Sequence, residues 1–213
     1  MIFQLNDNDV VFPDPFLAEA DGLLAIGGDL SSARLMNAYH NGIFPWYAEG
    51  DPICWYAPPE RCVIFPQHIH ISKSMKKILA KNKFQIKMDT DFEEVIRQCK
   101  TILRKGEHGT WINSDMEKAY IALYKQGFAH SIEAWYNNEL VGGMYGLNIN
   151  GVFCGESMFS KIDDASKIVM IWICSKSDFR LLDCQIPNPH LLMMGAKMIS
   201  QKEYLDILHA TKD

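Results

Sequence analysis

The sequence predicts an α+β fold in which a small N-terminal α/β domain (residues 1–65) precedes a larger domain (residues 66–213) with a mostly antiparallel sheet. Residues 129–159 alternate with a period of two, and the turn pairs Asn137-Asn138 and Asn150-Gly151 divide them into a meander. Helical periodicity with capping residues flanks this stretch on both sides. Prolines and aromatic residues crowd the first 65 residues, which rules out long helices there.

The composition is that of an ordinary globular protein. The chain has 213 residues, of which 48% are hydrophobic and 22% charged, and its net charge is −5. No apolar run approaches the roughly 20 residues of a membrane span. No basic-then-apolar leader opens the chain. The six cysteines form no CxxC pair and no histidine spacing typical of zinc. We therefore expect a cytoplasmic monomer with reduced thiols, no metal or cofactor, and no affinity for DNA or membranes.

The N-terminal unit contains one strand and one helix that can be assigned. An apolar strand lies between the turns at Asp21-Gly22 and Gly27-Gly28. Ser31 or Ser32 can cap a helix that runs to about residue 41. Aromatic residues interleaved with prolines follow: Phe44, Trp46, Tyr47, Trp55 and Tyr56. Such a cluster either fills a small core or forms a platform on which a nucleic-acid base stacks.

A basic helix is expected after residue 71, with Ser72 or Ser74 as its cap. Six lysines occur in and after it with no acid between them: Lys73, Lys76, Lys77, Lys81, Lys83 and Lys87. A run of like charge is usually a solvated face. In an acidic chain it is also typical of a patch that contacts phosphates.

The remaining elements are predicted from caps and periodicity. Two capping boxes, Thr90–Glu93 and Ser114–Glu117, open the helices before the meander. A helix from residue 165 to about 175 and a strand at 180–186 come after it. Helices are expected at 190–198 and 201–209, the second with a capping box at Ser200–Glu203.

Two acids stand out because apolar residues surround them. Glu156 lies in the block GVFCGESMFS, and Asp183 lies in LLDCQI. Burying a carboxylate is costly unless it is paired, so each is either a structural partner or part of a site. Strand alternation would place Asp183 and Gln185 on one face and Cys184 on the other. That arrangement leaves Cys184 without a neighbouring base and disfavours it as a nucleophile.

The order of strands and helices resembles an acetyltransferase-like fold, but no pyrophosphate-binding loop of the acyl-CoA type is present, which argues against acetyl-CoA. The blocks GLLAIGGDL, GIFPWY, GTWIN, FCGESMFS, LLDCQ and HLLMMGA occur in this order. Together they resemble the signature of the bacterial leucyl/phenylalanyl-tRNA–protein transferases over about residues 10–205. The resemblance implies a GNAT-like C-terminal domain related to Fem-type peptidyl transferases.

The family activity implied is transfer of Leu or Phe, and Met less well, from aminoacyl-tRNA to the N-terminal Arg or Lys of a protein, which marks it for N-end rule degradation. The implied catalytic residues are Asp183, Gln185 and Glu156. The implied contacts of the tRNA 3′-adenosine are Trp46, Trp111, Tyr39 and Tyr120. The implied side-chain pocket consists of Met144, Phe153 and Met158, and the tRNA phosphates would meet Lys73 and Lys77.

The implied reaction starts from an activated ester, so an amine can displace the ribose oxygen without ATP, metal or CoA. In the family scheme Gln185, polarised by Asp183, draws the proton from the amine, but a neutral amide is a weak base and is better suited to orienting it. Two rival functions stay open: a Fem-type ligase with another amine acceptor, and a non-enzymatic tRNA- or peptide-binding module. The helix and loop at 168–182 are shorter than is usual in the family, which bears on the Leu/Phe preference.

Overall fold

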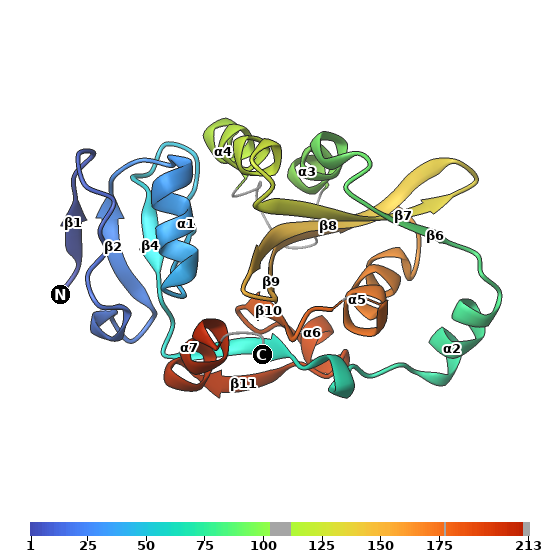
Figure 1. Cartoon of the computed structure of the whole chain (residues 1–213). Coiled ribbons are helices and arrows are strands. Elements are labelled where there is room, and N and C mark those ends of the chain that lie inside the picture. Colours follow the sequence, from blue (N-terminus) through green and yellow to red (C-terminus); the bar gives the residue numbers. More distant parts are fainter. Residues whose placement is uncertain (103–111, 177, 211–213) are drawn as a thin grey trace.

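The protein folds around two sheets in the computed structural model, which describes residues 1–102, 112–176 and 178–210 (Figure 1). The smaller sheet has the strand order β1-β2-β4-β3 and the larger has the order β11-β5-β10-β9-β8-β7-β6. Every described pairing in the larger sheet is antiparallel except that of β9 with β10. The α+β class, with a small N-terminal sheet and a mixed, mostly antiparallel larger one, is thereby confirmed.

The N-terminal sheet carries one helix. Its strands are β1 (Phe3–Leu5), β2 (Leu23–Gly27), β3 (Phe44–Pro45) and β4 (Cys54–Tyr56), with a 3-10 turn, η1, at Pro15–Leu17. Helix α1 spans Ser32–His40, and the Ser31 side chain accepts the Arg34 N–H at its start. Gly42 closes it with a φ of 69°. The predicted strand, helix and caps are confirmed here.

The larger sheet is built on the predicted meander. Its strands are β5 (Glu60–Ile64), β6 (Gln85–Met88), β7 (Ala129–Tyr136), β8 (Glu139–Ile149), β9 (Val152–Ser160), β10 (Leu181–Gln185) and β11 (Lys197–Ser200). Asn137 and Asn138 adopt φ values of 50° and 62°, as the tight β7–β8 hairpin requires. Asn150 and Gly151 do the same between β8 and β9, with φ values of 51° and 81°.

Three short strands of this sheet were not predicted: β5, β6 and β11. The segment expected to be a helix at 190–198 contains only α6 (Pro189–Met193). Gly195, at a φ of 96°, ends that helix, and the chain then pairs with β5 as β11. Strand β5 comes from the first 65 residues but pairs with β10 and β11, so the domain boundary at residue 65 stays a prediction.

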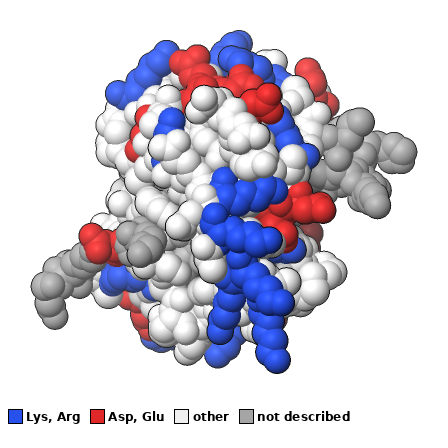
Figure 2. Space-filling view, turned by 90° about the vertical axis from the view of Figure 1, so that its right-hand side faces the viewer, with Lys and Arg blue, Asp and Glu red and all other residues white. Residues whose placement is uncertain are grey.

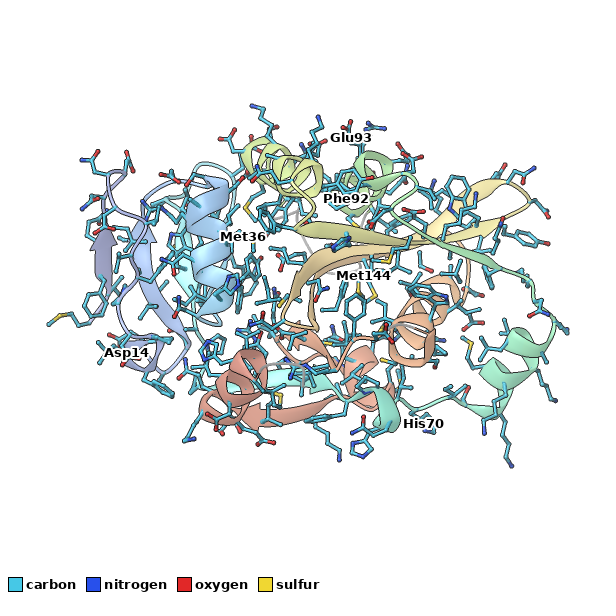
Figure 3. All side chains as sticks on the ribbon, in the orientation of Figure 1. Asp14, Met36, His70, Phe92, Glu93 and Met144 are labelled. Carbon is cyan, nitrogen blue, oxygen red and sulfur yellow. The ribbon has the colours of Figure 1, made fainter. Side chains whose placement is uncertain are left out.

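Helices cover both faces of the larger sheet. The helices that follow β5 are α2 (Lys73–Ala80), α3 (Phe92–Thr101), α4 (Ser114–Lys125), α5 (Ala165–Lys176), α6 and α7 (Gln201–His209), with a 3-10 turn, η2, at Pro66–His68. Helices α3 and α4 lie on one face and α5 on the other (Figure 1). Phe92 and Met144 belong to separate core clusters on these two faces (Figure 3). In the described part of the chain, no helix is long and apolar enough to span a membrane.

Two of the three predicted capping boxes are wrong. The Thr90 hydroxyl donates to the buried Glu133 rather than capping α3. Helix α4 is capped by Asn113, whose side chain accepts the N–H groups of Asp115 and Met116. The third box is confirmed, because the Ser200 hydroxyl accepts the Glu203 N–H. At α3, Glu133 binds the hydroxyl of Thr90, which was expected to be the cap. At α4, Asn113 binds N–H groups of the first turn in place of the expected Ser114.

Candidate active site

The parallel pair β9 and β10 brings the two predicted acids together. The pairing ends where Asp183 lies opposite Cys154. Beyond this point a cavity of about 300 Å³ opens, and its lining includes Glu156, Asp183 and Gln185. A cavity at the point where strands part is a common place for a small-molecule site. The structure therefore unites, at one cavity, residues that lie 29 positions apart.

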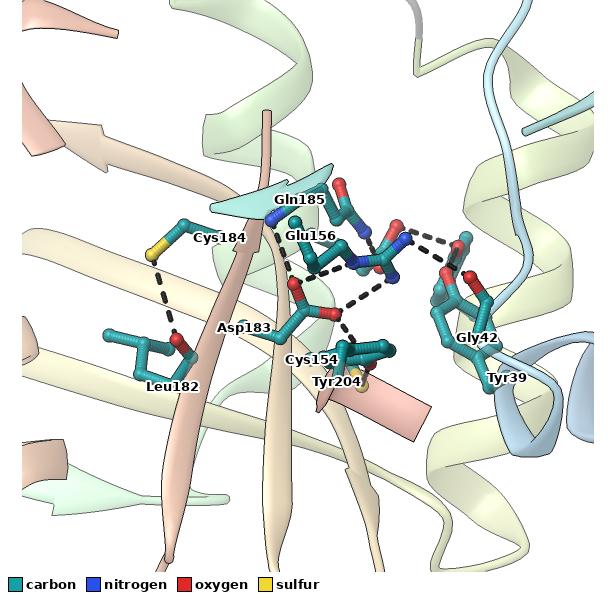
Figure 4. A network of polar contacts seen from close by, with 11 residues as sticks. Tyr39, Gly42, Cys154, Glu156, Leu182, Asp183, Cys184, Gln185 and Tyr204 are labelled. Carbon is teal, nitrogen blue, oxygen red and sulfur yellow. Dashed lines mark hydrogen bonds and ion pairs between the residues drawn. The ribbon is translucent and has the colours of Figure 1, made fainter. Parts of the chain in front are cut away.

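Asp183 is fully buried, and both of its oxygens have partners (Figure 4). The Arg61 guanidinium donates from Nε to Oδ1 and from Nη2 to Oδ2, each at 2.9 Å. The Tyr204 hydroxyl also donates to Oδ2, at 2.8 Å. Burial acts to lower the pKa of Arg61, but the charge of Asp183 outweighs it and holds that pKa above its ordinary value. Arg61 therefore keeps its charge beside Asp183 in the buried pair.

Gln185 departs from the strand alternation expected for it. Its φ is 60°, and the β10–β5 register shifts between Asp183 and Gln185. A left-handed backbone is unfavourable for a residue other than glycine, and here the Gln185 N–H donates to Asp183 Oδ1 at 2.8 Å. The side-chain amide turns to Glu156 instead, with Nε2 donating to Oε1 at 2.7 Å. Asp183 thus contacts the main chain of Gln185, whereas the family scheme expected it to polarise the side chain.

Glu156 is the titratable group at the centre of this arrangement. It is only 8% exposed. The Tyr120 hydroxyl donates to its Oε2 at 2.8 Å, and the Tyr39 hydroxyl bonds to that of Tyr120. Burial raises the pKa of Glu156 to about 7, the charge of Asp183 adds to the rise, and hydrogen bonds from the tyrosines and Gln185 oppose it. A carboxylate with a pKa near neutrality can exchange a proton under physiological conditions.

This raised pKa predicts a pH-dependent stability. The pKa is about 7 in the folded protein against an ordinary value of 4.5, so the folded state holds the proton more tightly between these values. The contribution of Glu156 to stability is therefore present at low pH and lost as pH rises towards 7, by up to about 3 kcal/mol. We expect the free energy of unfolding, measured with urea, to fall less between pH 5 and pH 8 for Glu156→Gln than for the wild type. Parallel losses in the two proteins would contradict the shift.

Two of the three residues predicted to form the side-chain pocket lie at the cavity wall. Met144 and Met158 line it. Phe153 is fully buried and packs its ring on Phe179, 5.0 Å between centroids, and it is not among the described residues at the cavity. His190, which was not among the predicted site residues, also lines the cavity, and burial followed by the charge of Lys167 lowers the pKa of its imidazole.

The predicted adenosine contacts lie in different environments. Trp46 is 44% exposed and packs edge-on against Tyr56, with 5.7 Å between ring centroids. Tyr39 and Tyr120 are buried, so in this conformation they present no open ring face and instead act on Glu156 through their hydroxyls. Trp111 lies outside the described residues. The stacking role of these residues stays a prediction.

The basic patch is present on α2. Lys73, Lys76 and Lys77 are exposed, and Lys81 and Lys83 directly after the helix are also exposed. Figure 2, which views the side of the molecule that α2 forms, shows Lys and Arg side chains gathered there into one continuous area. Such a surface suits a phosphate backbone although the whole chain is acidic.

Metal and thiol chemistry find no support among the described residues. No group of three or more His, Cys, Asp or Glu side chains in the described part could hold a metal ion. All six cysteines are free. Burial, then the neighbouring Cys62 and Asp183, raise the pKa of the Cys184 thiol well above its ordinary value. It therefore stays protonated, which is consistent with its rejection as a nucleophile.

Comparisons with known proteins match this chain over most of its length. The family model "Leucyl/phenylalanyl-tRNA protein transferase" matches residues 63–209, and the model of the N-terminal domain of the same family matches residues 28–59. A leucyl/phenylalanyl-tRNA–protein transferase of Desulfatibacillum aliphaticivorans is 47% identical over 205 residues, covering 95% of this chain and 88% of the relative. One of Flavobacterium johnsoniae is 48% identical over 203 residues, covering 94% and 96%.

Proposed function

The chain belongs to the leucyl/phenylalanyl-tRNA–protein transferase family, and from this premise we propose the substrates and the reaction steps of its site. The chain is an aminoacyltransferase that takes an aminoacyl-tRNA donor and a protein acceptor. The donor group is Leu or Phe, and Met less well. The acceptor is the N-terminal Arg or Lys of a protein, which is thereby marked for N-end rule degradation in the cytoplasm. The enzyme acts as a monomer. Its fold is GNAT-like, and the parting of β9 and β10 at the cavity supports this proposal for the fold.

The reaction exchanges one acyl bond for another. The α-amine nitrogen attacks the ester carbonyl, the C–N bond forms, and the bond from the carbonyl carbon to the ribose oxygen breaks. That oxygen leaves as a hydroxyl with a proton from the amine. Because the ester is already activated, the enzyme has to position the two reactants and supply a proton path.

The hydrogen bond between Gln185 and Glu156 is the observation on which the proposed proton path rests. An ionised carboxylate only accepts, so it holds the NH₂ group of Gln185 and leaves the amide oxygen to accept from the incoming amine. Glu156, with its pKa near 7, takes one proton from the ammonium form of the acceptor. Gln185 then orients the neutral amine for attack. Because Asp183 is paired with Arg61, Glu156 is the carboxylate left to attract the cationic acceptor.

The aminoacyl group of the donor occupies the side of the cavity that Met144 and Met158 line. Its side chain lies against Met144 and Met158, whose unbranched thioethers can accommodate Leu, Phe and Met. Phe153 would support this pocket from beneath, through the core. Trp46 and Trp111 would stack on the 3′-adenosine, with Tyr39 and Tyr120 holding Glu156 behind it.

One assay separates this proposal from its rivals. Purified protein is incubated with labelled Leu-tRNA and a peptide that starts with Arg, and in parallel with a matched peptide that starts with Gly. Labelled product with the Arg peptide alone is expected. A Fem-type ligase with another amine acceptor would transfer leucine to neither peptide. Binding of tRNA without any turnover would indicate a binding module instead.

Neutralising two lysines of α2 is expected to weaken tRNA binding. For Lys73→Gln with Lys77→Gln, we expect affinity for Leu-tRNA to fall about 10-fold and the slope of log K against log salt to decrease by about 2. The rate at saturating tRNA should not change. Lys202→Gln, an exposed lysine paired with Asp206 on α7, is the matched control. An unchanged salt slope in the double variant would place the tRNA elsewhere.

A further inference from the structure

Arg61 joins the N-terminal unit to the strand that carries the catalytic residues. It is 2% exposed on β5. Its Nη1 donates to the main-chain oxygen of Gly42, just after α1, at 3.0 Å. Its guanidinium carbon lies 4.7 Å from the centre of the Phe44 ring and 4.6 Å from that of Tyr204. The planar cation is therefore held between two aromatic rings, with its remaining edge directed at Asp183.

The contacts of Asp183 exclude a direct role on substrate. Oδ1 accepts from Arg61 Nε and from the Gln185 N–H, and Oδ2 accepts from Arg61 Nη2 and from the Tyr204 hydroxyl. A carboxylate offers about four lone-pair positions, so these contacts fill them. The side chain is also fully buried. Asp183 can therefore reach the reacting atoms only through a neighbour, and that neighbour is Gln185.

We infer that Arg61 is a positioning residue for transfer: its fork fixes Asp183, Asp183 fixes the left-handed backbone of Gln185, and Gln185 places the acceptor amine. This inference rests on the proposed function of Gln185. Figure 4 shows these contacts as one connected network that continues through Glu156 to Tyr39. The fork geometry requires arginine, because a lysine ammonium is a point charge that cannot hold both carboxylate oxygens in one plane.

Helix α7 and Gly42 complete the support. Tyr204 of α7 both stacks on Arg61 and donates to Asp183. Gly42 permits this approach: a Cβ on Gly42 would lie 2.9 Å from Leu205 Cδ2 and 3.2 Å from Tyr204 Cε1. The last helix of the chain and the end of α1 are thereby part of the device that orients Gln185, although neither reaches the cavity.

Arg61→Lys and Tyr204→Phe test this inference in the leucine-transfer assay with the Arg-starting peptide. Arg61→Lys keeps the charge and loses the fork, so kcat should fall about 100-fold while KM for Leu-tRNA changes less than about 3-fold. Tyr204→Phe removes one hydrogen bond from Asp183 and keeps the ring, so a fall in kcat of about 10-fold is expected. Thermal unfolding measures the folded fraction of each variant.

Arg34→Lys is the matched control, because Arg34 is also fully buried and ion-paired, with Asp29 at 3.5 Å, but does not contact the site. Its kcat per folded molecule should equal that of the wild type. The inference is overturned if Arg61→Lys keeps the wild-type kcat, or if all three variants lose activity only in proportion to unfolding. If the wild-type protein itself transfers nothing, the proposed function fails as well, which is a separate result.

Discussion

Replacing Asp183 by asparagine is expected to lower leucine transfer by about 1000-fold while Leu-tRNA binding changes less than about 3-fold. Asparagine turns one oxygen into an NH₂ group, which faces donors of Arg61, Tyr204 or Gln185 on every side. Breaking a buried ion pair costs about 3–5 kcal/mol, and where the NH₂ group takes the place of Oδ1 the Gln185 N–H also loses its acceptor. Single-turnover transfer and equilibrium tRNA binding, measured on the same preparation, separate the two effects.

The matched control for Asp183→Asn is Asp89→Asn. Asp89 also accepts a main-chain N–H at 2.8 Å, from Ser131, and pairs with His130, but it does not border the cavity. We expect its transfer rate to equal that of the wild type. If Asp183→Asn loses tRNA binding and transfer in equal measure, Asp183 serves the stability of the domain and does not position Gln185 for transfer.

Replacing Glu156 by glutamine is expected to reduce single-turnover transfer at pH 8 by about 100-fold, because the substitution removes both the proton acceptor and the carboxylate that orients the Gln185 amide. The substitution preserves size and can still accept from Tyr120, but its NH₂ group then faces the NH₂ group of Gln185, whose amide must turn over. What it removes is the group that takes a proton from the acceptor. Quench-flow measurement at saturating Leu-tRNA and Arg-starting peptide reads this step directly.

Glu133→Gln is the control for this substitution. Glu133 is also a buried glutamate, it accepts hydrogen bonds from Thr90 and Ser131, and it does not line the cavity. Its loss should appear in stability and not in the rate per folded molecule. A Glu156→Gln protein that transfers at the wild-type rate would leave Glu156 with a structural role only.

Local signals in the sequence predicted much of the scaffold. Turn pairs such as Asn137-Asn138 fix a hairpin by their own left-handed preference, and Ser31 caps α1 through a hydrogen bond to its near neighbour. Strand β11 was missed because it is short and its stability comes from pairing with β5, more than 130 positions earlier in the chain. A single sequence does not show such a pairing.

The candidate site residues were predicted from their types and not from their contacts. Glu156 and Asp183 stood out as acids among apolar residues, which physical reasoning marks as needing partners. Their partners could not be read from the sequence: Arg61 lies 122 residues before Asp183. The left-handed turn at Gln185 also breaks the alternation on which its predicted direction relied. Arg61 gave one signal, a charged residue directly before the apolar run Cys62-Val63-Ile64.

The pH dependence of single-turnover leucine transfer, compared between the wild type and Glu156→Gln, tests the central claim most directly. The acceptor amine, with an ordinary pKa of about 7.7–8.0, titrates in both proteins. The wild type should show a further rise in rate with a midpoint near pH 7, because Glu156 must be ionised to take the proton. The variant should retain only the step of the amine. Identical profiles in the two proteins would contradict the claim that Glu156 receives the proton of the acceptor.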